Sequence, residues 1–130
     1  MHHLDTTPQP KGTLALQTVP MPKDTNSEGD IFGGWLVSQM DIAGVVAASK
    51  IAQGRVATVA IDHMSFMIPV KVGSVISCYT DIVSIGRSSI QVHIEVWMKS
   101  PYTTETQKVT DGLFVFVALD ADGRTRAIEQ

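Results

Sequence analysis

The segment 30–52, DIFGGWLVSQMDIAGVVAASKIA, constrains the fold of this chain more than any other. It predicts one long helix that is apolar nearly all round, and a helix of that kind must be buried. Within residues 31–52 the polar side chains are only Ser38, Gln39, Asp41, Ser49 and Lys50. Because Gln39 and Asp41 interrupt a segment that is already short for a membrane span, we expect protein to surround it.

Asp41 is the anomaly in this helix. An ionised carboxylate in the middle of an apolar helix is costly unless it is paired, hydrated or used in chemistry. Asp41 is therefore the first candidate for a functional residue.

Five further segments predict β-strands, one before the helix and four after it. They are rich in β-branched and aromatic residues and are bounded by turn formers. They cover residues 13–19, 56–67, 74–85, 88–100 and 108–119. The short links between the last three favour antiparallel hairpins, because parallel neighbours need longer crossovers. We expect a strand, the helix and a four-strand antiparallel meander, with the sheet curling around the helix.

Finer expectations concern the helix ends and two of the strands. Asp30 or Ser27 should cap the start of the helix, and Gly54 should supply the left-handed residue that ends it. Segment 88–100 alternates strictly enough to predict one packed face and one wet face. Segment 108–119 is apolar on both faces, which predicts a central strand or a subunit contact.

Composition limits the classes of function. A chain of 130 residues predicts a single domain, 13–130, after a flexible leader, 1–12. The net charge of −3 argues against nucleic acid or an anionic membrane as the main partner. With one cysteine and no apolar signal segment near the N-terminus, we expect a cytoplasmic protein without a disulfide framework. The hydrophobic content of 44% points to self-association.

Several features converge on the start of the helix. Asn26 and Asp30 lie in the approach loop, Gly33 and Gly34 open the first turn, and Asp41 lies two turns farther along the face of Gly34. Paired glycines let a ligand approach the backbone N–H groups and the positive end of the helix dipole. That arrangement suits a thioester oxygen that gains negative charge in a transition state. Alternatively, the glycines permit close packing on the sheet and Asp41 bonds a buried backbone group.

Other candidate residues are weaker. His63 and His93 stand singly on strands, without the neighbouring ligands that a metal site requires. Cys78 has no obvious activating base and is expected to pack as a small apolar residue. The glycine pair lacks the companions of a P-loop or a dinucleotide fingerprint.

Four segments together resemble a known family, the YciA-like hot dog acyl-CoA thioesterases, which are related to the cytosolic acyl-CoA hydrolases. The segments are residues 24–44, 56–79, 86–97 and 109–124. They contain, in family order, Asn-x-x-Gly-x-x-x-Gly-Gly from Asn26, Met-Asp at Asp41, Phe-x-x-Pro-Val-x-x-Gly from Phe66 and Gly-Arg-Ser-Ser from Gly86.

The resemblance implies an α+β hot dog fold, with a five-stranded antiparallel sheet wrapped around one long central helix. It also implies a dimer whose sheets join edge to edge, often assembled into a hexamer as a trimer of dimers. Asp41 corresponds to the family's catalytic carboxylate, and Asn26 to its partner, contributed across the dimer interface. Gly86, Arg87, Ser88 and Ser89 fall where such proteins hold the coenzyme A moiety.

The activity implied is hydrolysis of acyl-CoA to free acid and coenzyme A, without a metal or redox cofactor. Asp41 would act as general base or as nucleophile, and the N–H groups of Gly33 and Gly34 would polarise the carbonyl. Asn26 would position water or substrate. The Arg87 guanidinium could bind phosphate oxygens in a bidentate manner. Alternatively, Arg87 is an exposed hairpin arginine that contacts only solvent.

Two other functions fit parts of the pattern. A hot dog hydratase or dehydratase would act on the same thioesters, but such enzymes pair their acid with a histidine, and none stands near Asp41 in the helix segment. A non-catalytic acyl-CoA or lipid-binding protein would bind the thioester without turnover.

Overall fold

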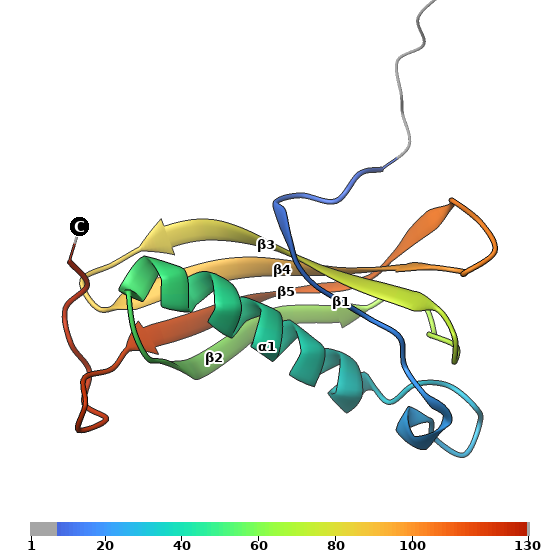
Figure 1. Cartoon of the computed structure of the whole chain (residues 1–130), viewed down its shortest axis with the longest axis horizontal. Helices are drawn as coiled ribbons and strands as arrows, with labels where there is room; N and C mark the ends of the chain where they lie inside the picture. The colour runs from blue at the N-terminus through green and yellow to red at the C-terminus, as the bar shows by residue number, and fades with distance from the viewer. Residues whose placement is uncertain (1–7, 130) are drawn as a thin grey trace, which may run out of the picture.

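The computed structural model describes residues 8–129. A five-stranded antiparallel sheet curves around one long helix, which lies along its concave face (Figure 1). The elements are β1 (Thr13–Thr18), a short 3-10 helix (Pro22–Asp24), α1 (Gly33–Ala52), β2 (Val56–Phe66), β3 (Val75–Ile85), β4 (Ser89–Lys99) and β5 (Thr106–Ala118). The predicted α+β architecture is confirmed, and of the expected leader, residues 1–7 lie outside the described residues.

The order of strands corrects one prediction. The sheet runs β1-β3-β4-β5-β2, so the meander contains only β3, β4 and β5, and β2 pairs with β5. β5 pairs with β4 along one edge and with β2 along the other, so it is an internal strand, which agrees with the first of the two alternatives predicted for its segment. The segment after β2 does not turn back as a hairpin but passes the start of α1, where Val70 is buried and its carbonyl accepts the Ile31 N–H at 2.9 Å.

The helix buries one face against the sheet. Met40, Ala43 and Ala48 are fully buried there, and Gly44 permits the closest approach, since a Cβ at this position would stand 2.4 Å from Cζ of Phe116. The opposite face of the helix is accessible to solvent in the single chain, and Ile42 on that face is half exposed. Among residues 8–129, no helix combines the length and hydropathy needed to cross a membrane.

Both predictions for the helix ends are wrong. Phe32 is the N-cap residue and makes no side-chain cap bond, while Asp30 forms an ion pair with Lys71. At the other end Gln53, rather than Gly54, takes the left-handed conformation, with φ of 54°. The Gln53 side-chain amide donates a hydrogen bond of 2.8 Å to the Lys50 carbonyl. One carbonyl of the last helical turn thereby gains a partner.

β4 only partly matches its predicted faces. Ile90, Val92, Ile94 and Val96 are fully buried beneath α1, as expected. On the face expected to be wet, Glu95 is only 5% exposed. The chain preceding β1 crosses this side of the sheet, and the Lys11 N–H donates to Glu95 Oε1 at 3.2 Å. The segment that precedes β1 therefore covers part of the β4 face that the alternation of apolar and polar residues predicts to be exposed to solvent.

Candidate functional site

Asp41 projects from α1 toward β2. The Thr58 hydroxyl donates a hydrogen bond of 2.5 Å to its Oδ1, and the carboxylate is partly buried. Within residues 8–129 no other hydrogen bond or ion pair reaches the Asp41 side chain. The alternative that Asp41 serves a buried backbone group is therefore wrong, and Oδ2 is available to a water molecule or a substrate.

Thr58 is a hydrogen-bond partner of Asp41 that the sequence did not reveal. β2 changes register with β5 between Thr58 and Ala60, so Val59 forms an irregularity in the ladder. Bulges of this kind re-aim side chains and disturb the alternation of faces. The run VATVAI has no clear period of two, and the only signal for Thr58 was one hydroxyl in an otherwise apolar segment.

The start of α1 presents unoccupied donors. Trp35 and Leu36 donate their N–H groups to the Phe32 carbonyl, whereas no acceptor within residues 8–129 bonds the N–H of Gly33 or Gly34. A Cβ on Gly34 would meet nothing within 4 Å. The close-packing explanation therefore does not apply to Gly34, and the helix dipole adds positive potential at the same place.

A largely apolar cavity of about 300 Å³ lies beside this end of the helix. Gly33 lines it, and Cζ of Phe66 stands 3.3 Å from where a Cβ of Gly33 would be. The other lining residues are Asp30, Ile31, Leu36, Met67, Ile68, Pro69 and Val70. The cavity can receive an apolar group next to the free N–H donors. Asp41 does not line it.

Asn26 organises the approach loop. Its Oδ1 accepts the N–H groups of Glu28 at 2.9 Å and Asp30 at 3.1 Å, and its own N–H donates to the Asp30 carbonyl at 2.7 Å. Among residues 8–129 no hydrogen bond joins Asn26 to Asp41. Asp41 lies eight residues beyond Gly33, about 12 Å along the helix axis.

The segment Gly86 to Ser89 turns the chain from β3 into β4. It lies at the end of the molecule near the last turn of α1, opposite the helix start (Figure 1). Backbone bonds fix it, since the Ala118 N–H donates to the Ser88 carbonyl at 2.9 Å and the Ile128 N–H to the Arg87 carbonyl at 2.7 Å. Arg87 itself is exposed. One protomer therefore does not bring the expected coenzyme A residues to the helix start, which is about 30 Å away along α1.

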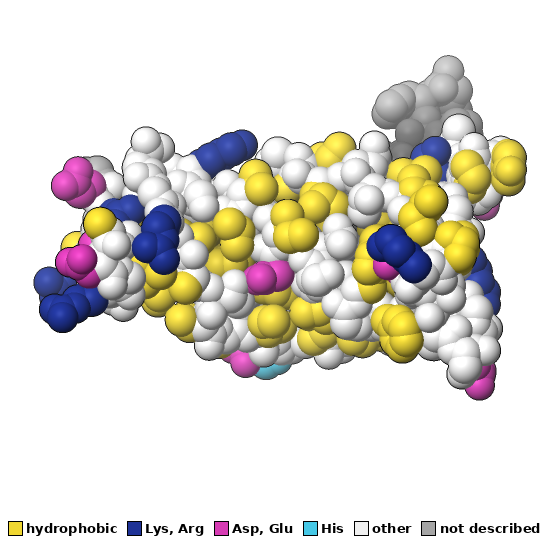
Figure 2. Space-filling model, turned by 60° about the horizontal axis from the view of Figure 1, so that its bottom comes forward, with side chains coloured by type: hydrophobic (Ala, Val, Ile, Leu, Met, Phe, Trp, Pro, Cys, Tyr) yellow, Lys and Arg dark blue, Asp and Glu magenta, His cyan; other side chains and the backbone are white. Residues whose placement is uncertain are grey.

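Exposed apolar side chains of α1 and β2 form what we call the α1–β2 surface. Its members are Ile42, Val46, Val59 and Ile61. Figure 2, which views the molecule from this side, shows hydrophobic side chains gathered over the middle of the face. Contiguous apolar surface of this kind is typical of a contact with another chain.

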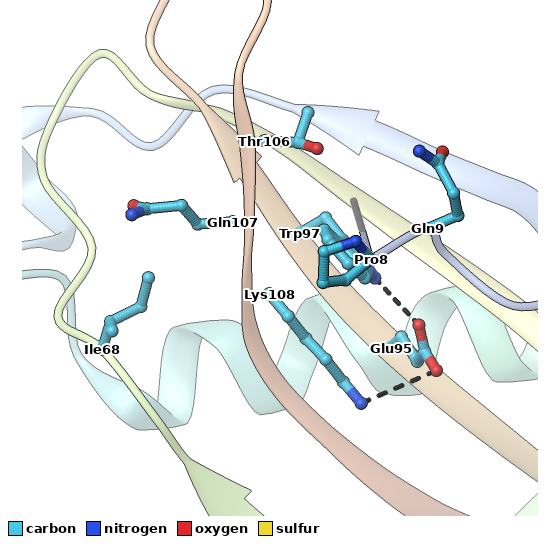
Figure 3. Close-up of a pocket in the computed structure, with 8 residues that line it drawn as sticks. All are labelled: Pro8, Gln9, Ile68, Glu95, Trp97, Thr106, Gln107 and Lys108. Carbon is cyan, nitrogen blue, oxygen red and sulfur yellow. Dashed lines mark hydrogen bonds and ion pairs between the residues drawn. The ribbon is translucent and has the colours of Figure 1, made fainter. Parts of the chain in front are cut away.

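A second cavity, of about 480 Å³, lies on the opposite face of the sheet. There Trp97 and Lys108 both point toward Glu95 (Figure 3), with Trp97 Nε1 donating to Glu95 Oε1 at 2.9 Å. Asp111 lies beside this group, bonded by His93 at 3.0 Å and by Lys108 at 3.2 Å. Burial raises the pKa of Asp111, but these two bonds outweigh it and hold that pKa below its usual value. None of the site residues predicted from the sequence lines this cavity.

The remaining candidates have structural roles or none. Cys78 is buried, and burial raises the pKa of its thiol to about 12, which confirms it as an inert packing residue. His63 is exposed on β2, with φ of 54°. No group of three or more His, Cys, Asp or Glu side chains in the described part of the chain is arranged to hold a metal ion.

Comparison with known proteins agrees with this geometry. The model of the thioesterase superfamily matches residues 28–105, which include α1, β2, β3 and β4. The chain belongs to this superfamily. It is 49% identical to the acyl-CoA thioester hydrolase YciA of Escherichia coli, with 92% of each chain covered. The resemblance to YciA-like hot dog acyl-CoA thioesterases is thereby confirmed.

Solved structures of this family have the same fold. A hexameric thioesterase of Yersinia pestis is 48% identical and has a TM-score of 0.90, over 94% of this chain and 99% of that one. A hexameric broad specificity acyl-coenzyme A thioesterase, solved as a mutant with one aspartate replaced by alanine, is 49% identical. Its TM-score is 0.89, over 92% of this chain and 88% of that one. The hot dog fold is thereby confirmed.

Proposed function

We propose that this chain hydrolyses acyl-CoA to a free carboxylic acid and coenzyme A, with Asp41 as the catalytic carboxylate. One observation carries the assignment of Asp41: it is a partly buried carboxylate with a hydroxyl on one oxygen and no protein partner within residues 8–129 on the other. A structural carboxylate in that position would be expected to have a charged or fully bonded partner. The names of the family members support the substrate class.

Two chemical routes start from this carboxylate. In the first, Asp41 takes a proton from a water molecule as the water oxygen adds to the thioester carbonyl carbon. The tetrahedral intermediate then breaks its C–S bond, which leaves the free acid and coenzyme A thiolate, and the thiolate takes up a proton. In the second, the carboxylate itself adds, coenzyme A thiolate leaves, and water cleaves the resulting anhydride. The N–H groups of Gly33 and Gly34 are the proposed donors to the oxyanion in both routes. Thiolate is a good leaving group, so neither route requires a histidine.

A second copy of the chain is proposed to complete the site. Asn26 has its Oδ1 engaged by the loop but its amide N–H₂ unbonded within the described residues, so this group can orient water or substrate at a partner's Asp41. Arg87 would grip a phosphate of coenzyme A, with Ser88 and Ser89 adding hydroxyl donors. The α1–β2 surface and the unpaired edge of β2 supply the contact for a dimer. The hexameric relatives support assembly into a trimer of dimers.

The deciding experiment measures coenzyme A release from acyl-CoA esters of increasing length, from acetyl to palmitoyl. The chain and its Asp41→Ala variant are compared at matched oligomeric state. We expect turnover by the wild type and at least about a 100-fold lower kcat in the variant, the usual size of a lost general base. Equal release by both proteins would remove Asp41 from the chemistry. No release by either would favour a non-catalytic acyl-CoA-binding protein.

The hydratase alternative is less well supported by the geometry. Such an enzyme needs an acid and a histidine acting together, and within residues 8–129 no histidine bonds Asp41. His93 is instead engaged with Asp111 on the opposite face of the sheet. We therefore keep hydrolysis as the proposed reaction.

A further inference from the structure

We propose that the C-terminal segment, residues 119–128, positions the turn 86–89 for binding the phosphate groups of coenzyme A, and that Ile128 is its positioning residue. The inference deepens the proposed function and rests on it. Its starting point is the Ile128 N–H, which donates a hydrogen bond of 2.7 Å to the Arg87 carbonyl. Arg87 is the residue of the turn best suited to bind phosphate, because its guanidinium can bond two phosphate oxygens at once.

The turn depends on neighbouring segments for support. The Gly86 N–H closes it by donating to the Ser89 carbonyl at 2.8 Å. Two further backbone bonds reach its carbonyls from outside, one from the last residue of β5 and one from Ile128. The second bond holds the backbone of Arg87, whose exposed side chain has no hydrogen bond or ion pair within residues 8–129. The direction in which the guanidinium projects therefore depends on the C-terminal segment.

The C-terminal segment folds back on β5. Asp120 Oδ1 accepts the N–H groups of Asp122 and Arg124, both at 2.9 Å, and the Asp120 N–H donates to the Arg124 carbonyl at 2.7 Å. These bonds form a tight turn, which an aspartate side chain commonly stabilises in this way. The Arg126 N–H then donates to the Ala118 carbonyl at 2.9 Å, so the returning chain lies against the end of β5. Figure 1 shows the segment at the same end of the molecule as the turn between β3 and β4.

Two side chains anchor the C-terminal segment. The Arg126 guanidinium donates to the carbonyl of Ala52, the last residue of α1, at 2.6 Å and to the Leu119 carbonyl at 3.0 Å. Ile128 is 8% exposed and packs with the hydrophobic core, and it is the one buried side chain among residues 121–129. Because burial of this side chain fixes the backbone of the same residue, it also fixes the N–H that bonds Arg87. The segment thus connects the turn to the end of α1 and to the core.

Cations outnumber acids in the segments that meet at this end, residues 50–55, 86–89 and 119–129. They are Lys50, Arg55, Arg87, Arg124 and Arg126 against Asp120, Asp122 and Glu129. Asp120 is engaged by backbone N–H groups, and within residues 8–129 no ion pair uses any of these cations. Figure 2 shows several Lys and Arg side chains at this end of the molecule. Coenzyme A carries a diphosphate and a 3′-phosphate, which such a cluster of cations attracts.

Positioning of the turn has a kinetic signature. A turn that is held in place before the ligand arrives loses less entropy on binding. Because the phosphates are remote from the thioester, their contacts strengthen binding of the ground state and the transition state equally, so the effect belongs to KM and not to kcat. The effect should be absent from N-acetylcysteamine thioesters, which carry the same reacting group without any phosphate.

Two substitutions test the anchor. Ile128→Ala removes most of the side chain, and Ile128→Val keeps most of it. With the acyl-CoA that the wild type hydrolyses fastest, we expect Ile128→Ala to raise KM by about 10-fold, the effect of one weakened contact to a charged group, with kcat within about twofold of the wild type. For the N-acetylcysteamine thioester of the same acid, kcat/KM should stay within about twofold. Ile128→Val should return KM to near the wild-type value.

Ile76→Ala is the matched control. Ile76 is fully buried near the start of β3, at the opposite end of that strand from the turn. Its truncation should lower stability without changing the ratio of the kcat/KM values for the two substrates. Sedimentation velocity and circular dichroism must show the same assembly and fold for every variant compared. An unchanged KM for acyl-CoA in Ile128→Ala, or equal losses of kcat/KM with both substrates, would overturn the inference.

A double variant shows whether Ile128 acts through Arg87. Arg87→Ala should also raise KM for acyl-CoA selectively, and Ile128→Ala should have no further effect once Arg87 is alanine. An additive rise in KM, or a wild-type KM in Arg87→Ala, would contradict the inference. The two proposals fail separately, since a wild type that does not hydrolyse acyl-CoA refutes the proposed function, whereas an active wild type with an insensitive Ile128 refutes only this inference.

Discussion

At the scale of single residues, Asp41 differs from two other buried or partly buried carboxylates, Glu95 and Asp111, in its partners. Glu95 and Asp111 lie within reach of Lys108 and His93, and Glu95 is also bonded by Trp97. Asp41 has only a neutral hydroxyl. Glu95 and Asp111 are therefore satisfied by the fold itself, whereas Asp41 has capacity left for water or substrate.

The network around Asp111 makes a prediction about stability and pH. Because its folded pKa lies below the usual 3.8, ionised Asp111 contributes stability that is complete above 3.8 and is lost as the pH falls through the lower folded value. Asp111→Asn should lower Tm at pH 7 by roughly 4 °C, corresponding to a pair worth about 1 kcal/mol. The difference from wild type should shrink as the pH falls below 3.8.

Thermal unfolding followed by circular dichroism across this pH range provides the measurement. Asp122→Asn is the control, because Asp122 is exposed and its carboxylate has no hydrogen bond or ion pair within the described residues. A Tm difference for Asp111→Asn that persists unchanged at the lowest pH would show that the loss comes from packing and not from ionisation.

At the scale of elements, the sequence predicted what depends on local periodicity and missed what depends on pairing. The helix and every strand were located to within about three residues, because an apolar run of helical length and alternating β-branched runs are local signals. The edge position of β2 and the register change after Thr58 depend on which strands pair with each other. No short stretch of sequence contains that information. The hydrogen bond between Asp41 and Thr58 could not be predicted for the same reason, because the register change after Thr58 contributes to it.

Two glycines of α1 give opposite predictions. A Cβ at Gly44 would stand 2.4 Å from Cζ of Phe116 and 2.9 Å from Cδ1 of Ile94, whereas one at Gly34 would meet nothing within 4 Å. Gly44→Ala should therefore destabilise the fold by about 1–3 kcal/mol despite the better helix propensity of alanine. Gly34→Ala should leave Tm unchanged or higher, yet lower kcat, because a methyl group would obstruct access to the free N–H donors.

Chemical denaturation and coenzyme A release distinguish these outcomes. If Gly34→Ala retained full turnover, the N–H groups at the helix start would not be the oxyanion donors. If Gly44→Ala were as stable as wild type, α1 would have room to move away from β5, and the close approach at Gly44 would not be required.

At the scale of the whole molecule, the residues proposed for the thioesterase site lie in three separate places of one chain. Asp41 lies in the third turn of α1, Asn26 in the approach loop, and Arg87 at the far end of the sheet. Neither of the two cavities described above is lined by any of these three residues. A single chain accordingly does not assemble the proposed groups, and contact between two chains through the exposed α1–β2 surface is the proposed way to combine them.

This leads to a prediction about mixed oligomers. Asn26→Ala and Asp41→Ala should each be nearly inactive, because every site lacks one of the two groups. If each site takes Asn26 from one chain and Asp41 from the other, a two-fold symmetric dimer with one variant of each kind contains one intact site and one doubly altered site. Random mixing of equal amounts should then restore about a quarter of the wild-type activity, since half of the dimers are mixed and each has one working site.

Coexpression with two different affinity tags, followed by tandem purification, isolates assemblies that contain both variants, and coenzyme A release measures their activity. The double variant Asn26→Ala/Asp41→Ala mixed with wild type is the control for exchange itself, because its mixed dimers contain two half-altered sites and should be inactive. Activity in that control, together with none in the mixture of single variants, would show that Asn26 and Asp41 act within the same chain. The loop at Asn26 would then have to move toward its own helix, and the shared-site arrangement would be wrong.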